Sequence, residues 1–190
     1  MVMATEAEGP GVRHALWLQG CPLRCPGCCN PEMLSFSGGT ERSITELVAE
    51  LCTVEAEGIS LLGGEPFAQA EGASRLAMAV QEQGLSVMIF TGFTLAQLRA
   101  RKDPATEALL AHCDILVDGP FQSKELDTKR SWIGSSNQEM HFLSDRYDGS
   151  EPAFHQGNSV EIRLRPGSLS VNGWPSASRA FDPRLRRRDS

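Results

Sequence analysis

The sequence predicts an α/β fold in which a parallel sheet forms an open, partial (β/α) barrel, followed by a C-terminal β-hairpin. Short apolar runs alternate with amphipathic segments over the first 120 residues, an order that implies a parallel sheet with right-handed crossovers. Only four such runs occur, which is too few to close an eight-stranded barrel. Further on, two alternating runs flank Pro166 and Gly167, as is typical of a hairpin.

The predicted strands are short and apolar, and they cover residues 12–20, 59–64, 85–92 and 114–121. The third is apolar throughout, as expected when both faces of a sheet are covered. Amphipathic spacing predicts helices over 43–58, 70–84, 94–102 and 104–113. Two of these helices begin with a capping box, formed by Ser43 with Glu46 and by Thr94 with Gln97. In this interpretation Gly58 ends the first helix, and Cys52 and Cys113 are buried core residues.

The remainder of the chain has no such alternation. Residues 122–158 are polar and irregular, and 159–173 form the expected hairpin. We therefore expect one domain over residues 1–175 and a basic, flexible tail over 176–190. The arginines of the tail are read as a solvated end or, alternatively, as a docking patch for an acidic partner.

Composition excludes several classes of protein. The net charge of −6 provides no bulk attraction to nucleic acid. No window is long and apolar enough for a membrane span, and the acidic N-terminus has no apolar core of a secretory signal. We therefore expect a cytoplasmic protein without nucleic-acid or membrane partners. The reducing cytoplasm also argues against disulfides among the six cysteines.

The polar motifs of the chain follow its predicted strands. A cysteine-rich loop, residues 20–30, follows the first strand, and the segment Gly63-Gly64-Glu65-Pro66 follows the second. Thr91 begins the loop after the third strand, and Asp118 ends the fourth, where it serves either as a polar contact or as a strand terminator. The carboxyl ends of parallel strands share one edge of a sheet, so these motifs are expected to form one ligand site.

Cys21, Cys25 and Cys28 form a C-x3-C-x2-C pattern. A structural zinc site needs four ligands and usually draws them as two short pairs, and no second pair is present in the sequence. An electron-carrying cubane cluster also takes four cysteines. Three cysteines would leave one iron of a 4Fe-4S cluster open for chemistry.

This pattern, with GGEP after the next strand, resembles the radical S-adenosylmethionine (SAM) superfamily. The opening segment GPGVRHALWLQGCPLRCPGCCNPEM resembles that of the glycyl-radical activating enzymes. The segments DILVDGPF and WIGSSNQ are similar to those of activating proteins of anaerobic ribonucleoside-triphosphate reductase. The resemblance covers residues 9–138, and it implies that Trp132–Gln138 contact SAM or the partner.

The resemblance implies one 4Fe-4S cluster, held by Cys21, Cys25 and Cys28, with SAM bound at the fourth iron. It implies SAM contacts from Gly27, Cys28, Cys29, Gly63, Gly64, Glu65, Pro66 and Thr91. Gly64→Val is then expected to weaken SAM binding without removing the cluster. The implied reaction is reductive cleavage of SAM to a 5′-deoxyadenosyl radical, which generates a glycyl radical on a partner enzyme. Flavodoxin or a ferredoxin is the implied reductant.

One residue departs from the family pattern, because Cys29 stands where the family usually has Tyr. Stacking on adenine is therefore not expected from this side chain, although its backbone can still make contacts. Two alternatives stay open at this point. The chain could be a small radical SAM enzyme that modifies another protein, peptide or metabolite, or a non-catalytic zinc or iron–sulfur binding protein.

Overall fold

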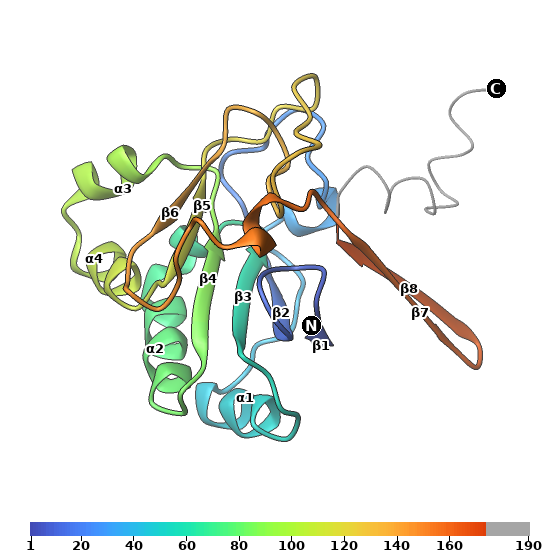
Figure 1. Cartoon of the computed structure of the whole chain (residues 1–190). Helices are drawn as coiled ribbons and strands as arrows, with labels where there is room; N and C mark the ends of the chain where they lie inside the picture. Colours follow the sequence, from blue (N-terminus) through green and yellow to red (C-terminus); the bar gives the residue numbers. More distant parts are fainter. Residues whose placement is uncertain (174–190) are drawn as a thin grey trace.

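The computed structural model describes residues 1–173 of the chain (Figure 1). The predicted tail, 176–190, lies outside the described residues. The predicted strands and helices all occur, in the predicted order. None of the helices within residues 1–173 is long and apolar enough to cross a bilayer.

The central sheet is mixed and has six strands in chain order. These are β1 (Val2–Thr5), β2 (Arg13–Leu18), β3 (Gly58–Gly63), β4 (Ser86–Phe90), β5 (Ile115–Asp118) and β6 (Glu139–Phe142). Strands β2 to β5 are parallel, as expected, whereas β1 and β6 pair antiparallel at the two edges. Neither edge strand is expected from the sequence, and β6 lies in the segment predicted to be irregular. Curvature of this sheet into a partial barrel stays a prediction.

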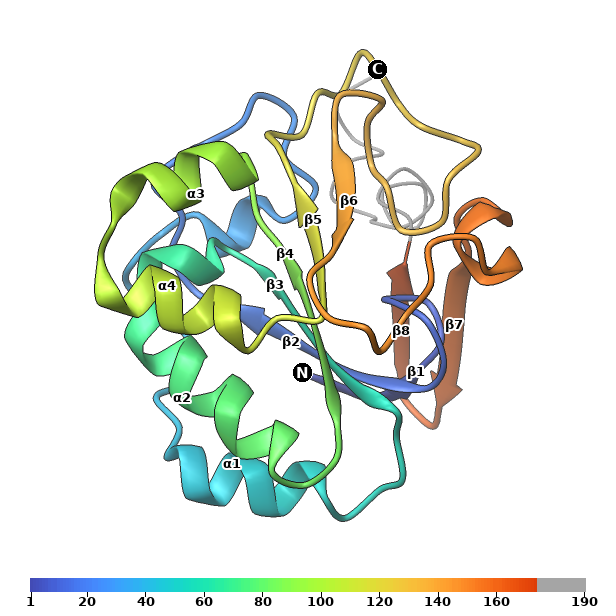
Figure 2. The same ribbon diagram turned by 60° about the vertical axis from the view of Figure 1, so that its left-hand side comes forward.

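The helices of the described residues cover one face of the sheet, as both views show (Figures 1 and 2). They are α1 (Ile44–Leu51), α2 (Ala70–Gln81), α3 (Leu95–Arg101) and α4 (Pro104–Ala111). Short 3-10 turns, η1 (Pro31–Met33), η2 (Pro66–Gln69) and η3 (Pro152–His155), lie in the loops. Thr94 and Gln97 form the predicted reciprocal capping box, and the Ser43 hydroxyl accepts a hydrogen bond from the Glu46 backbone at 3.4 Å.

The first helix is shorter than predicted. It ends at Leu51, and Gly58 is the first residue of β3 rather than a helix end. The Thr53 hydroxyl donates to the carbonyl of Glu50 at 2.7 Å, which satisfies a carbonyl of the last turn and lets the chain turn away. Cys52 is consequently exposed, and its prediction as a core residue is wrong, whereas Cys113 is buried as predicted.

Alternate residues of each strand face opposite layers. Ile59, Leu61, Val87 and Ile89 face the helices and are fully buried against them. On the other face, the side chains that share a second buried cluster are Met88, Ile115, Val117, Ile133 and Phe154. The sheet is therefore covered on both faces, as predicted for the apolar third strand.

Arg13 is fully buried at the beginning of β2. Its guanidinium donates to the carbonyl of Ile59 at 2.6 Å, to the Ser86 hydroxyl at 2.8 Å and to the Tyr147 hydroxyl at 3.1 Å. The residue thus ties together the amino ends of β2, β3 and β4, which lie at the opposite end of the strands from the cysteine loop.

The C-terminal hairpin consists of β7 (Val160–Arg165) and β8 (Ser168–Gly173), which pair antiparallel as a separate two-stranded sheet. It projects beyond β1, away from the helices (Figure 1). The prediction of a hairpin is therefore confirmed.

Candidate functional site

A cavity of about 1020 Å³ opens at the carboxyl ends of the parallel strands. The side chains of Trp17, Leu62 and Phe90 line it, so it lies over the face of the sheet that the helices leave uncovered. The loops that follow β2, β3, β4 and β5 all contribute to its wall. The convergence of these loops at one edge is therefore confirmed.

The cavity brings together most of the predicted site residues. Those that line it are Cys21, Cys25, Cys28, Cys29, Gly63, Gly64, Glu65 and Thr91. Gly27 and Pro66 lie beside the cavity rather than in its lining. Pro66 is buried at the start of η2, directly after Glu65.

The cysteine loop is fixed by backbone hydrogen bonds at both its ends. The amide of Gly20 donates to the carbonyl of Met33 at 2.9 Å, and that of Cys21 donates to Leu34 at 3.2 Å. Within the loop, the amide of Cys28 donates to the carbonyl of Cys25 at 3.1 Å, which forms a tight turn. Gly27 occupies this turn with φ +76°, in the left-handed region, and a Cβ there would lie 2.7 Å from the Ser123 hydroxyl.

The three predicted ligand cysteines line the same cavity. Burial raises the pKa of the Cys25 thiol, an interaction with the backbone of Phe121 opposes this shift, and the neighbouring thiols Cys28 and Cys21 reinforce it. The thiols are therefore close enough to influence one another. Within residues 1–173 no three His, Cys, Asp or Glu side chains surround a position for a single ion. A cubane cluster does not need such a set, because its cysteines bind different irons.

The GGEP segment is joined directly to the cysteine loop. The amide of Gly64 donates to the carbonyl of Leu18 at 2.7 Å, and the amide of Glu65 donates to the carbonyl of Gly20 at 2.9 Å. A Cβ on Gly64 would lie 2.3 Å from the Gly20 carbonyl oxygen. The absence of a side chain at Gly64 is therefore required by the cysteine loop itself.

Glu65 connects the loops that follow β3 and β4. Its carboxylate is 1% exposed and accepts hydrogen bonds from the Thr91 hydroxyl at 2.8 Å, the Gly92 amide at 2.9 Å and the Phe67 amide at 3.0 Å. Burial raises the pKa of this carboxyl, while these donors oppose the shift. All three donors belong to the protein, so the geometry gives the side chain a cross-linking role, and a contact of Glu65 with SAM stays a prediction.

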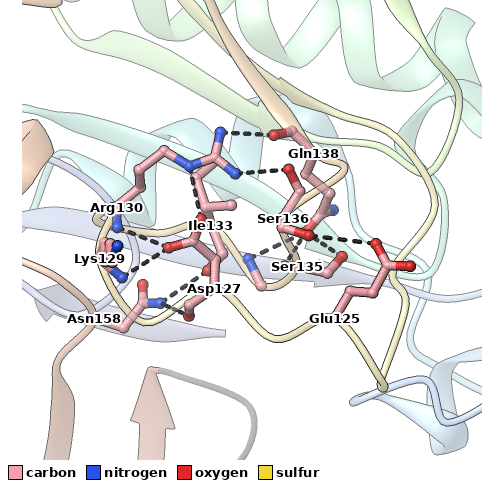
Figure 3. A network of polar contacts seen from close by, with 10 residues as sticks. Glu125, Asp127, Lys129, Arg130, Ile133, Ser135, Ser136, Gln138 and Asn158 are labelled. Atoms are coloured by element: carbon pink, nitrogen blue, oxygen red, sulfur yellow. Dashed lines mark hydrogen bonds and ion pairs between the residues drawn. The ribbon is translucent and has the colours of Figure 1, made fainter.

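The segment between β5 and β6 closes another side of the cavity. The side-chain oxygen of Gln138 accepts from the amides of Gly134 and Ser135 at 3.1 and 3.0 Å, and its nitrogen donates to the carbonyl of Gly119 at 3.0 Å. Arg130 donates to the backbone of Gln138 and pairs with Asp127, as Figure 3 shows. Trp132 and Gln138 line the cavity, which places part of the predicted segment Trp132–Gln138 at the site.

Asp118 contributes to the frame rather than to the lining. Its carboxylate accepts from the amide of Leu95 at 2.6 Å, and the same oxygen lies 2.9 Å from Nε2 of His141. The residue thereby joins the ends of β5, α3 and β6. This geometry favours the structural alternative of the two that the sequence left open.

Two parts of the wall are not expected from the sequence. Glu8 belongs to one of them, the turn between β1 and β2, and residues 170–173 of β8 form the other. Burial raises the pKa of Glu8 to about 7, although the amide of Gly173 donates to its carboxylate at 2.8 Å. These residues reach the site because the turn after β1 bonds to β8, more than 160 positions later in the chain. No local sequence pattern predicts such a long-range contact.

The comparison with protein families matches residues 7–141 to a 4Fe-4S single cluster domain. Curated relatives include the anaerobic ribonucleoside-triphosphate reductase-activating protein of Vibrio cholerae, which is 34% identical over 143 residues, or 70% of this chain and 90% of the relative. The protein of the same name from Escherichia coli K12 is 30% identical over 145 residues, or 72% of this chain and 92% of the relative. That of bacteriophage T4 is 29% identical over 145 residues, covering 73% and 88% of the two chains.

These relatives are named as activating proteins, and the cysteine loop with its adjoining GGEP segment lies within the residues that match the 4Fe-4S domain. The cofactors of the family are one 4Fe-4S cluster and SAM. The chain belongs to the single-cluster 4Fe-4S family of radical SAM activating proteins.

Proposed function

We propose that this protein generates a glycyl radical on an anaerobic ribonucleoside-triphosphate reductase, using SAM as the source of the radical. The observation that carries the proposal is that Cys21, Cys25 and Cys28 line one cavity with residues of the GGEP segment. The names of the relatives support the choice of partner. The cavity of about 1020 Å³ is large for one small molecule, which fits a site that also admits a segment of a partner.

We assign the cluster to Cys21, Cys25 and Cys28. Held by these three thiolates, a reduced 4Fe-4S cluster would supply one electron for cleavage of SAM into methionine and a 5′-deoxyadenosyl radical, which would take a hydrogen atom from glycine. The turn at Gly27 holds Cys25 and Cys28 at a fixed spacing. The loop that follows β5 shields the cluster side of the cavity, since the backbone of Phe121 interacts with the Cys25 thiol.

For SAM we assign contacts to the rim beside the cysteine loop. Gly63, Gly64 and Thr91 line this rim, together with Cys29. Glu65 also lines the cavity and fixes Thr91 by a hydrogen bond, while Pro66 supports the rim from behind at the start of the buried turn η2. Gly27 and Cys28 supply backbone groups from the same cysteine loop as Cys29. The chain's own task is to orient the sulfonium and to exclude water.

The reaction needs an external one-electron donor, and a flavodoxin or a ferredoxin is the class that we assign to this role. Reduced thiols and a reduced cluster fit the cytoplasm, where the cysteine distribution predicts that the protein works.

The test is an anaerobic assay with the reconstituted protein, SAM and dithionite, with and without the reductase of the source organism. We expect 5′-deoxyadenosine and methionine in both cases, and a glycyl-radical EPR signal on the reductase. Cys28→Ala should abolish all of these products. Cys52→Ala, at an exposed cysteine, serves as the matched control and should retain them.

A protein loaded with four irons that yields no 5′-deoxyadenosine would contradict the radical chemistry. Formation of 5′-deoxyadenosine without a radical on the reductase would instead point to another protein, peptide or metabolite as the substrate.

A further inference from the structure

The hairpin β7–β8 is attached to the body through its polar face. Arg163 donates to the carbonyls of Met3, at 2.6 Å, and of Ala4 on strand β1. From the neighbouring strand of the hairpin, Asn172 donates to the Thr5 hydroxyl at 2.7 Å, and Thr5 also bonds to Glu161. Glu161 and Asn172 are directly paired across the hairpin. The side chains that face the protein are thus charged or polar.

The opposite face of the hairpin is apolar and points outward. Ile162, Leu164 and Leu169 are 49%, 80% and 53% exposed. Leu164 pairs with Leu169 across the two strands, and Ile162 pairs with Val171, so the four side chains share one face. A hairpin that served only the stability of this chain would turn this face inward. The hairpin instead has its polar face toward the protein and its apolar face toward solvent. An exposed apolar patch of this kind marks a site of interaction with another molecule.

This apolar face continues into the cavity. Val171 is half-buried and lines the cavity, together with Ser170 and Asn172 of the same strand. Its cross-strand partner Ile162 is the next apolar side chain outward, and the Leu164–Leu169 pair follows toward the turn. The apolar face therefore begins at Val171 in the cavity wall and extends along the hairpin to the Leu164–Leu169 pair, whereas Ser170 and Asn172 reach the wall from the polar face.

We propose that this face of the hairpin, formed by Ile162, Leu164, Leu169 and Val171, is the docking ledge for the glycyl-radical partner. The proposal rests on the proposed function, which requires a glycine of a second protein to reach the cavity. Val171 places the base of this face in the cavity wall, so a polypeptide that reaches the cavity beside Val171 would contact it. A second copy of this chain is the less suitable occupant, because a copy seated on the ledge would stand where the substrate protein must enter.

The anchoring of the hairpin suits this role. The hydrogen bonds of Arg163 and Asn172 to β1 hold the base of the ledge next to Glu8, whose carboxylate accepts from the amide of Gly173. The ledge lies outside residues 7–141, which match the cluster domain, and Leu164 and Leu169 do not line the cavity. Changes at these two residues should therefore alter partner affinity without altering SAM cleavage.

The experiment compares the full-length, cluster-loaded protein with a variant that carries Leu164→Thr and Leu169→Thr. Threonine keeps the strand preference of the hairpin while it removes apolar surface. The affinity for the anaerobic reductase of the source organism is measured directly by fluorescence anisotropy, and SAM cleavage by dithionite is measured without the partner. We expect the partner Kd to rise about tenfold or more, as for loss of a central interface contact, and unassisted 5′-deoxyadenosine formation to stay unchanged.

Met78→Thr is the matched control, since Met78 is 44% exposed on α2, on the helix-covered side of the sheet. It should leave the Kd unchanged. An unchanged Kd in the double variant would overturn the docking ledge. Sedimentation showing that the wild type self-associates through the ledge, and that the double variant does not, would overturn it in favour of a second copy. Loss of 5′-deoxyadenosine in the wild type would refute the proposed function instead, and the direct Kd measurement would still decide the docking surface.

Discussion

Glu8 shows how a single residue of the wall can make the molecule sensitive to pH. The carboxyl group is 9% exposed, and burial raises its pKa from 4.5 to about 7. The hydrogen bond from the amide of Gly173 lowers this pKa in part, and the negative charge of Glu161 raises it further. The protein therefore holds this proton more tightly when folded than when unfolded.

This difference gives the sign of a pH effect. The stability contribution of protonated Glu8 is fully present below pH 4.5, and it is lost as the pH rises to about 7. The loss corresponds to about 3 kcal/mol of unfolding free energy. Glu8→Gln keeps an acceptor for Gly173 but cannot ionise, so it should remove this part of the pH dependence and be more stable than the wild type at pH 8.

Urea unfolding at pH 5 and pH 8 measures the effect, with the exposed Glu6→Gln as the control. Glu6→Gln should have the same free energy of unfolding as the wild type at both pH values. If Glu8→Gln were no more stable than the wild type at pH 8, the carboxyl would be solvated in the folded protein.

At the scale of elements, the cysteine loop and the GGEP segment behave as one unit. The Gly64 amide bonds to the end of β2, and the position of a Cβ on Gly64 is already occupied by the backbone of Gly20. The sequence predicts that a side chain at Gly64 weakens SAM binding without removing the cluster. The structure predicts damage to the cluster loop as well.

We expect Gly64→Ala to lower the iron content after reconstitution by more than half and to destabilise the fold by about 1–3 kcal/mol, as overpacking does elsewhere. Gly72→Ala is the matched control, because no atom lies within 4 Å of a Cβ at that helical position. The control should be neutral or slightly stabilising. Iron and sulfide analysis, with thermal unfolding, checks both variants; full iron content in Gly64→Ala would show that the two loops separate easily.

The same scale shows why the sequence predicts some elements and misses others. The central strands and the helices have their own periodicity, so β2 to β5 and α1 to α4 are recognised from local pattern. Strands β1 and β6 have four residues each, and each pairs with only one neighbouring strand at its own edge of the sheet. Their extended conformation therefore depends on that neighbour rather than on a local sequence pattern. Cys52 fits the helical spacing but follows the last residue of α1, a boundary set by the Thr53 hydroxyl.

For the site, the cysteine loop, GGEP and Thr91 are predictable because each directly follows a strand of the parallel sheet. Glu8 and the wall of β8 are not, since they arrive through contacts between residues more than 160 positions apart in the chain.

At the scale of the whole molecule, the fold and the cluster site are held by different forces. The buried apolar cluster between the sheet and the helices includes no residue of the cysteine loop, 20–30. That loop is held by backbone hydrogen bonds and, when loaded, by the cluster. Removal of the iron should therefore loosen the loop while the sheet and helices persist.

Chelation of the cluster is expected to lower Tm by about 5 °C, which corresponds to about 2 kcal/mol, without a change in far-UV circular dichroism. Trypsin should then cut faster after Arg24, which is exposed in the loop with φ 49°. Cleavage after Arg75, exposed on α2, should keep its rate. Equal protection of Arg24 with and without iron would mean that the loop is ordered by the protein alone.

The contact of Arg13 with Tyr147 has a consequence for synthesis of the chain. The guanidinium is fully buried, and the hydroxyl that receives it lies 134 residues later. While the protein is being translated, the first parallel strands can pair, but the charge at their base lacks this partner until residue 147 has left the ribosome. Ile59 and Ser86 can receive Arg13 earlier, so burial of the guanidinium begins when β4 pairs and is completed only when the loop that follows β6 has been synthesised.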